Sequence, residues 1–81
     1  SKPQSHTAKK TVVDPEYSVY KVKATTKWAC MYHYSRARFE NNSGKVAGDS
    51  GRKYGQGTST ATSGAVSTEL STYVAKTYWG S

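Results

Sequence analysis

The chain has 81 residues and carries 12 Lys and Arg against five Asp and Glu, which gives a net charge of +7. This length allows one domain with a small core, and no stretch approaches the ~18 consecutive apolar residues of a transmembrane helix. The charge favours an anionic partner such as nucleic acid, an acidic protein or a phosphate-bearing cell envelope, while the single cysteine excludes an internal disulfide.

Aromatic side chains replace the usual aliphatic ones. The chain has seven Tyr, two Trp and one Phe but only one Leu and no Ile. Ser and Thr are abundant, and they favour strands and turns over the interior of helices. We therefore expect an all-β fold, a small antiparallel β-sandwich of short strands.

Residues 1–14 are polar and basic, and Pro3 and Pro15 discourage regular structure there. We expect a flexible, disordered basic arm over residues 1–14, followed by a single β domain over residues 15–81. Because the first residues are polar, we see no signal peptide and expect the sequence to be the mature form if the protein is exported.

Two strands are expected next in the chain. The segment from Glu16 to Ala24 alternates, with Tyr20, Val22 and Ala24 on one face. The segment from Lys27 to Glu40 has the strongest strand pattern. One of its faces carries Ala29, Met31, His33, Ser35, Ala37 and Phe39, and the other carries Trp28, Cys30, Tyr32, Tyr34, Arg36, Arg38 and Glu40.

The rest of the chain is expected to contain a turn at residues 41–44, a mobile basic loop at residues 45–57 and a strand at residues 58–63. A last strand from Leu70 to Trp79 is expected to pair with a central strand and to seal the core with its aromatic rings. A helix over residues 65–76 is the alternative, which the Ser and Thr content disfavours.

No catalytic residue, metal site or cofactor is predicted. Residues 48–51 read Gly-Asp-Ser-Gly, as in the nucleophile segment of trypsin-like proteases, but Arg52 replaces the next glycine and the chain is too short for that fold. Cys30 and His33 lie three residues apart, so on a strand they point to opposite faces. Cys30 is interpreted as a small buried hydrophobe and His33 as a hydrogen-bonded face residue, with phosphate contact by His33 as the alternative.

Candidate binding residues lie on the second face of the long strand. Tyr32 and Tyr34 precede Arg36 and Arg38, and alternating rings and guanidinium groups can stack on sugars or bases and bind phosphate. Arg52 and Lys53 are further candidates for anion or sugar binding, because the glycine-rich loop beside them can form an anion nest. The alternative interpretations are a charged edge strand that resists aggregation and a solvated loop.

Residues 32–79 resemble the lactococcin 972 family of bacteriocins, which Gram-positive bacteria secrete. The resemblance lies in the order and spacing of five segments: His33-Tyr34-Ser35-Arg36-Ala37, Asn41-Asn42-Ser43-Gly44-Lys45, Gly48-Asp49-Ser50-Gly51-Arg52, Thr60-Ala61-Thr62 and Tyr73-Val74-Ala75-Lys76-Thr77-Tyr78-Trp79. The chain departs from the family at its Lys-rich start, at Cys30 and at Gly80-Ser81.

The resemblance implies a secreted, extracellular β-sandwich that blocks cell-wall synthesis and septum formation in related bacteria. Its partner would be the lipid-linked, pyrophosphate-bearing wall precursor, bound without pore formation. Two other functions stay open: a basic nucleic-acid-binding β module that uses Tyr32, Tyr34, Arg36 and Arg38, and an interaction or immunity-type protein. Homodimerisation is also open, since Tyr- and Trp-rich faces are common in interfaces.

Overall fold

A computed structural model describes residues 2–69 and 72–81 and shows one antiparallel sheet of six strands. The strands are β1 (Ser5–Asp14), β2 (Val19–Glu40), β3 (Val46–Ala47), β4 (Lys53–Thr62), β5 (Val66–Ser67) and β6 (Val74–Gly80). The predicted all-β antiparallel fold is confirmed. The described residues form no helix, so the helical alternative over residues 65–76 is wrong for its described part.

The 22-residue strand β2 organises the sheet, because each of the other five strands pairs with it. Its register shifts between Trp28 and Tyr32, and Cys30 within this interval has a φ of 59°. Before this bend the buried side chains occupy even positions, and after it they occupy odd ones (Val22, Ala24 and Thr26, then His33, Ser35, Ala37 and Phe39). The irregularity lets both halves of β2 turn their buried side inward.

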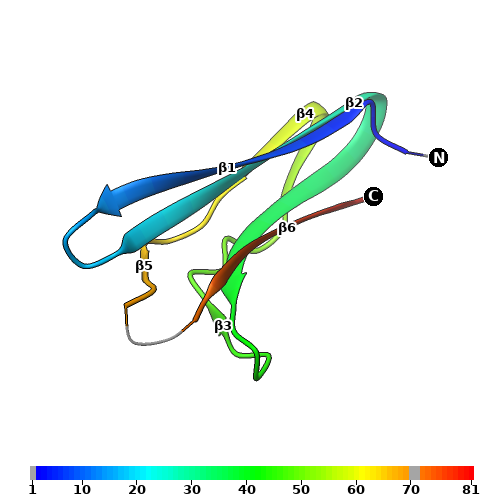
Figure 1. Cartoon of the computed structure of the whole chain (residues 1–81). Helices are drawn as coiled ribbons and strands as arrows, with labels where there is room; N and C mark the ends of the chain where they lie inside the picture. Colours follow the sequence, from blue (N-terminus) through cyan, green and yellow to red (C-terminus); the bar gives the residue numbers. More distant parts are fainter. Residues whose placement is uncertain (1, 70–71) are drawn as a thin grey trace.

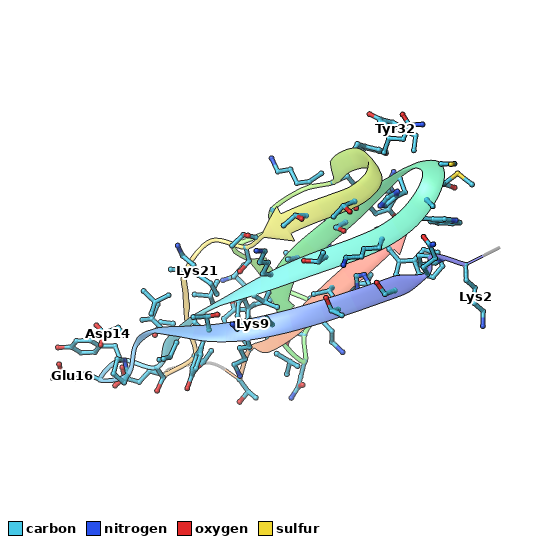
Figure 2. All side chains as sticks on the ribbon, turned by 90° about the horizontal axis from the view of Figure 1, so that it is seen from above. Lys2, Lys9, Asp14, Glu16, Lys21 and Tyr32 are labelled. Carbon is cyan, nitrogen blue, oxygen red and sulfur yellow. The ribbon has the colours of Figure 1, made fainter. Side chains whose placement is uncertain are left out.

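The bend folds one sheet into two layers. In Figure 1, β2 rises beside β1, reverses at its upper end and descends beside β6. Seen from above in Figure 2, β1, the first half of β2 and part of β4 lie side by side, with the second half of β2 and β6 behind them. Strand β4 pairs with both halves of β2 and so connects the layers.

The space between the layers is small and partly polar. Its apolar side chains are Val22, Ala24, Ala37, Phe39, Ala61 and Val66. The hydroxyl of Thr26 lies 2.7 Å from that of Ser35, which lies 2.8 Å from that of Ser59, so a chain of hydrogen bonds crosses the interior. Every buried polar side-chain atom in the described part of the chain has a hydrogen-bond partner, as polar groups in an interior require.

The prediction of a disordered arm is wrong for Ser5–Asp14, which forms β1 and pairs with Val19–Lys27. Most side chains of β1 are exposed because this strand lies at the edge of the sheet. An edge strand exposed on both faces shows no apolar alternation, which is why the sequence pattern did not reveal it.

Three further expectations concern single segments. Residues 53–57 belong to β4 rather than to a mobile loop, and Cys30 is exposed at the bend rather than buried. His33 is fully buried, with Nδ1 2.8 Å from the carbonyl oxygen of Met31 and Nε2 2.9 Å from that of Thr26. This confirms His33 as a hydrogen-bonded face residue, and its burial contradicts the alternative of phosphate contact.

The last predicted strand is confirmed for residues 74–79, which pair with the second half of β2, whereas residues 70 and 71 lie outside the described residues. Trp79 lies opposite the inward-pointing Ser35 and is 40% exposed, so it only partly covers the interior. Tyr78 lies opposite Arg36 on the outer side of β2, so the prediction that its ring seals the core is wrong.

Candidate functional site

The outer face of the second layer carries most of the predicted binding residues. Because His33, Ser35, Ala37 and Phe39 point inward, the alternate side chains of β2 point outward. Tyr34 lies opposite Tyr54 of β4 on one side and Gly80 of β6 on the other. We call this surface the Tyr–Arg face and define it by Tyr32, Tyr34, Arg36, Arg38, Arg52, Tyr54 and Tyr78.

One end of the Tyr–Arg face is aromatic. The rings of Tyr32 and Tyr54 stack with centroids 5.1 Å apart and planes 14° apart, and the ring of Tyr34 lies 5.5 Å from that of Tyr54. Tyr32 is 62% exposed and Tyr54 is 46% exposed, so parts of both rings outside their stacked contact are available to a ligand. We call these three residues the tyrosine platform.

The position of the Tyr34 ring in this platform depends on two neighbours, Arg52 and Gly80. The guanidinium carbon of Arg52 lies 4.6 Å from the centre of the Tyr34 ring, a cation–π distance. On the other side, a Cβ atom at Gly80 would lie 2.6 Å from the ring, so the absence of a side chain there leaves room for Tyr34. Among the described residues, Arg52 forms no ion pair, which leaves its charge available to an anion.

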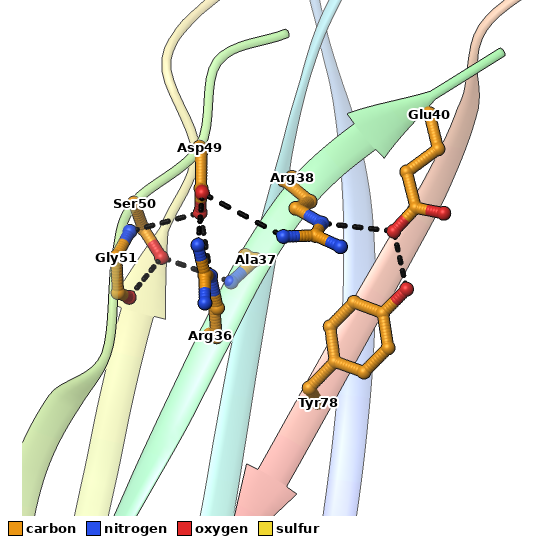
Figure 3. Close-up of polar contacts among 8 residues, drawn as sticks. All are labelled: Arg36, Ala37, Arg38, Glu40, Asp49, Ser50, Gly51 and Tyr78. Carbon is orange, nitrogen blue, oxygen red and sulfur yellow. Dashed lines mark hydrogen bonds and ion pairs between the residues drawn. The ribbon is translucent and has the colours of Figure 1, made fainter. Parts of the chain in front are cut away.

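The other end of the face is an array of paired charges (Figure 3). Arg36 donates from Nε and Nη2 to the two carboxylate oxygens of Asp49, the first bond measuring 2.9 Å. Arg38 donates from Nε to Glu40 at 2.8 Å, and the hydroxyl of Tyr78 donates to the same Glu40 oxygen. Two arginines and two carboxylates therefore offset each other.

The pKa values follow these hydrogen bonds. Hydrogen bonding from Arg36 holds the pKa of Asp49 far below its usual range. The hydroxyl of Tyr78, followed by the guanidinium of Arg38, lowers the pKa of Glu40, and the bond to Glu40 raises the pKa of Tyr78. Both carboxylates are therefore charged at neutral pH, so the array presents little net charge to a ligand.

The structure brings Tyr32, Tyr34 and Arg52 together and places Arg36 and Arg38 in ion pairs next to them. It separates Lys53 from this group, because Lys53 lies opposite Ser35, whose side chain points to the interior. Sequence reasoning missed Tyr54, because residues 45–57 read as a loop. It also missed Asp49 and Tyr78 as partners of the arginines, since these contacts join different strands and loops.

No protein-family model matches the chain, and neither a curated protein nor a solved structure is significantly similar to it. Across residues 2–69 and 72–81, no three His, Cys, Asp or Glu side chains gather into a set that could hold a metal ion. The same residues contain no helix long and apolar enough to span a membrane.

Proposed function

We propose that this protein is a secreted antibacterial protein that inhibits cell-wall synthesis and septum formation by binding a lipid-linked, pyrophosphate-bearing wall precursor. The observation that carries the proposal is the exposed, stacked pair of Tyr32 and Tyr54 beside Arg52, whose cation forms no ion pair with any described residue. In the proposed complex, a sugar ring packs on the tyrosine platform and Arg52 meets the pyrophosphate.

The chemistry of the two ligand parts suits these residues. Exposed tyrosine rings offer a rigid apolar surface with a polar edge, which fits the mixed faces of a sugar. The fork of an arginine makes paired hydrogen bonds to phosphate oxygens, and these are stronger than bonds between neutral groups. The resemblance of residues 32–79 to the lactococcin 972 family supports the same ligand.

A nucleic-acid-binding module is the alternative, because bases also stack on tyrosine rings. The nucleic-acid hypothesis assigns phosphate binding to Arg36 and Arg38, yet both arginines already form ion pairs with carboxylates. A phosphate would have to displace Asp49 or Glu40 from hydrogen bonds that involve charged groups on both sides. The pairing therefore favours a short ligand that reaches Arg52 over a strand that follows the whole Tyr–Arg face.

The test has two parts. The purified protein should bind vesicles that contain the lipid-linked precursor better than matched vesicles without it, and it should stop growth and disturb septa in Gram-positive cells. Tyr54→Ala and Arg52→Gln should weaken both effects at least tenfold, whereas Lys45→Gln, which removes one charge from the loop after β2, should not. Equal binding to both kinds of vesicle, or no inhibition of any strain that responds to related bacteriocins, would overturn the proposal.

A further inference from the structure

The outer face of the other layer is a continuous basic surface. Lys21, Lys23 and Lys27 alternate along β2 with the buried residues Val22, Ala24 and Thr26, so they share the outward side. Lys9 of β1 lies directly opposite Lys23. We call Lys9, Lys21, Lys23 and Lys27 the lysine face; Figure 2 looks onto this layer and labels Lys9 and Lys21.

The lysine face has no acidic partner within the described residues. The ion pairs among the described residues join Arg36 and Arg38 to Asp49 and Glu40, and these four residues lie on the opposite layer. Asp14 and Glu16 lie at the turn between β1 and β2, where the carboxylate of Asp14 accepts the backbone N–H of Glu16. Like charges directly opposite each other destabilise a strand pair, so the pairing of Lys9 with Lys23 costs stability and calls for an anion to offset it.

The side chains next to these lysines on the sheet carry hydroxyl groups. Across the three strands, the neighbours of the lysines are Ser5, Thr7, Thr11, Thr25, Thr58, Thr60 and Thr62. Hydroxyl groups donate to phosphate oxygens, but they offer nothing on which a nucleobase could stack. Phosphate is thus favoured as the anion, and a base-free phosphate chain is favoured over a nucleic acid.

The spacing of the lysines selects an extended ligand. Side chains two residues apart on a strand are separated by about 7 Å, so Lys21 to Lys27 span about 20 Å along β2. The four lysines occupy separate positions along two neighbouring strands of one sheet surface. A single phosphate group would meet one or two of them, whereas a chain of phosphates would meet all four.

We propose that the lysine face binds a linear polymer of phosphodiester repeats without bases, of the poly(glycerol phosphate) type. This face and the Tyr–Arg face lie on opposite layers, so the protein can hold the polymer while the tyrosine platform binds its own ligand. The lysine face draws on none of the residues assigned to precursor binding, so the two proposals stand or fall separately.

The test compares two triple variants of the full chain that carry the same net charge. One replaces Lys9, Lys21 and Lys23 by Gln, and the control replaces Lys2, Lys10 and Lys45 by Gln. Binding to fluorescent poly(glycerol phosphate) should weaken on the order of 100-fold in the first variant, at ~1 kcal/mol per lysine near an anionic surface. For the first variant, the slope of the logarithm of the binding constant against the logarithm of the salt concentration should also become shallower by about two to three. The control should stay within about threefold of the natural protein.

Three results would overturn this proposal. An equal loss in both triple variants would show that net charge alone drives binding. Tighter binding to phosphatidylglycerol vesicles than to the polymer would identify a membrane surface as the partner. Tighter binding to single-stranded DNA of equal phosphate number, abolished by Tyr54→Ala, would assign the interaction to the tyrosine platform. None of these measurements uses the wall precursor or target cells, so their failure is distinct from a failure of the antibacterial proposal.

Discussion

The imidazole Nε2 of His6 lies 2.9 Å from the hydroxyl of Thr77, which joins β1 to β6 across 71 residues of sequence. The other ring nitrogen, Nδ1, lies 2.8 Å from the hydroxyl of Thr26 on β2. Strands β1 and β6 both pair with β2 but not with each other, so the side chain of His6 connects the two layers where no backbone pairing joins them. This contact ties the first strand of the chain to the last.

Replacing His6 should weaken the contact between β1 and β6. We expect His6→Ala to lower the free energy of unfolding by about 1–3 kcal/mol at neutral pH, since it removes two hydrogen bonds. Urea unfolding measures the change. The control is Thr7→Ala, which alters the exposed neighbour on the outward side of β1 and should change stability by less than about 0.5 kcal/mol. Equal effects of the two substitutions would contradict the bridging role.

The same histidine makes stability depend on pH. Partial burial lowers the pKa of His6 below its usual value. The unfolded chain therefore takes up this proton more readily than the folded one, so the contribution of His6 is complete above about pH 6.5 and declines as the pH falls below that value. The natural protein should lose more stability than His6→Ala between about pH 7 and pH 5. Parallel pH profiles would contradict this expectation.

The second prediction concerns Asp49, which anchors the loop after β3 to β2. Besides binding Arg36, its Oδ1 accepts the backbone N–H of Gly51 at 2.9 Å. Asp49→Asn should cost about 1 kcal/mol at neutral pH, because the pair is partly exposed to solvent. In the natural protein this contribution is present above the usual Asp pKa of ~3.9 and is lost as the pH falls further, because the folded-state pKa is lower.

Thermal melts at several pH values test the Asp49 prediction. The control is Asp14→Asn, which makes the same change of charge at a carboxylate without an ion pair among the described residues. Asp49→Asn should flatten the acid dependence of the melting temperature, and the control should leave it closer to that of the natural protein. An unchanged acid dependence in Asp49→Asn would mean that the pair with Arg36 is not maintained in solution.

The third prediction concerns Gly80, which makes room for the tyrosine platform. The atoms that an added Cβ would meet all belong to the ring of Tyr34, which can rotate away without moving the backbone. We expect Gly80→Ala to displace Tyr34 from Arg52 and Tyr54 and to reduce binding of the wall precursor about tenfold, with a stability change below about 1 kcal/mol. Tyr34→Ala is the matched variant and should reduce binding by a similar factor. Unaltered binding in Gly80→Ala would remove Tyr34 from the site.

The sequence predicted what alternation can encode. The inward and outward faces of residues 32–40 follow from a period of two, as does the strand character of residues 74–79. The expected pairing of residues 74–79 with a central strand is confirmed as well. The bend at Cys30 could not be predicted this way, because the alternation of Trp28, Cys30 and Tyr32 reads as one continuous face. A residue in the left-handed region breaks that continuity without leaving a glycine as a signal.

The candidate site was predicted only in part, for a related reason. Tyr32 and Tyr34 stand on a strand that sequence alone identifies, but Tyr54 becomes their neighbour through pairing between β2 and β4. The ion pairs of Arg36 and Arg38 depend on a loop and on β6, and contacts across such distances in sequence leave no local pattern. Composition gave the net charge but could not show that Lys9, Lys21, Lys23 and Lys27 share the outer face of one layer.

The last prediction concerns Trp79, which the sequence placed in the core. Its ring meets that of Trp28 edge-on, with centroids 5.6 Å apart and an angle of 84°. Because Trp79 is 40% exposed, we expect Trp79→Ala to cost about 1–2 kcal/mol rather than the ~3–5 kcal/mol of a fully buried aromatic residue. A double-mutant cycle with Trp28→Ala should give a coupling of about 0.5–1.5 kcal/mol. Urea unfolding of the four proteins measures both values. Complete unfolding of Trp79→Ala would show that the ring seals the interior after all, and a coupling near zero would show that the two rings do not meet in solution.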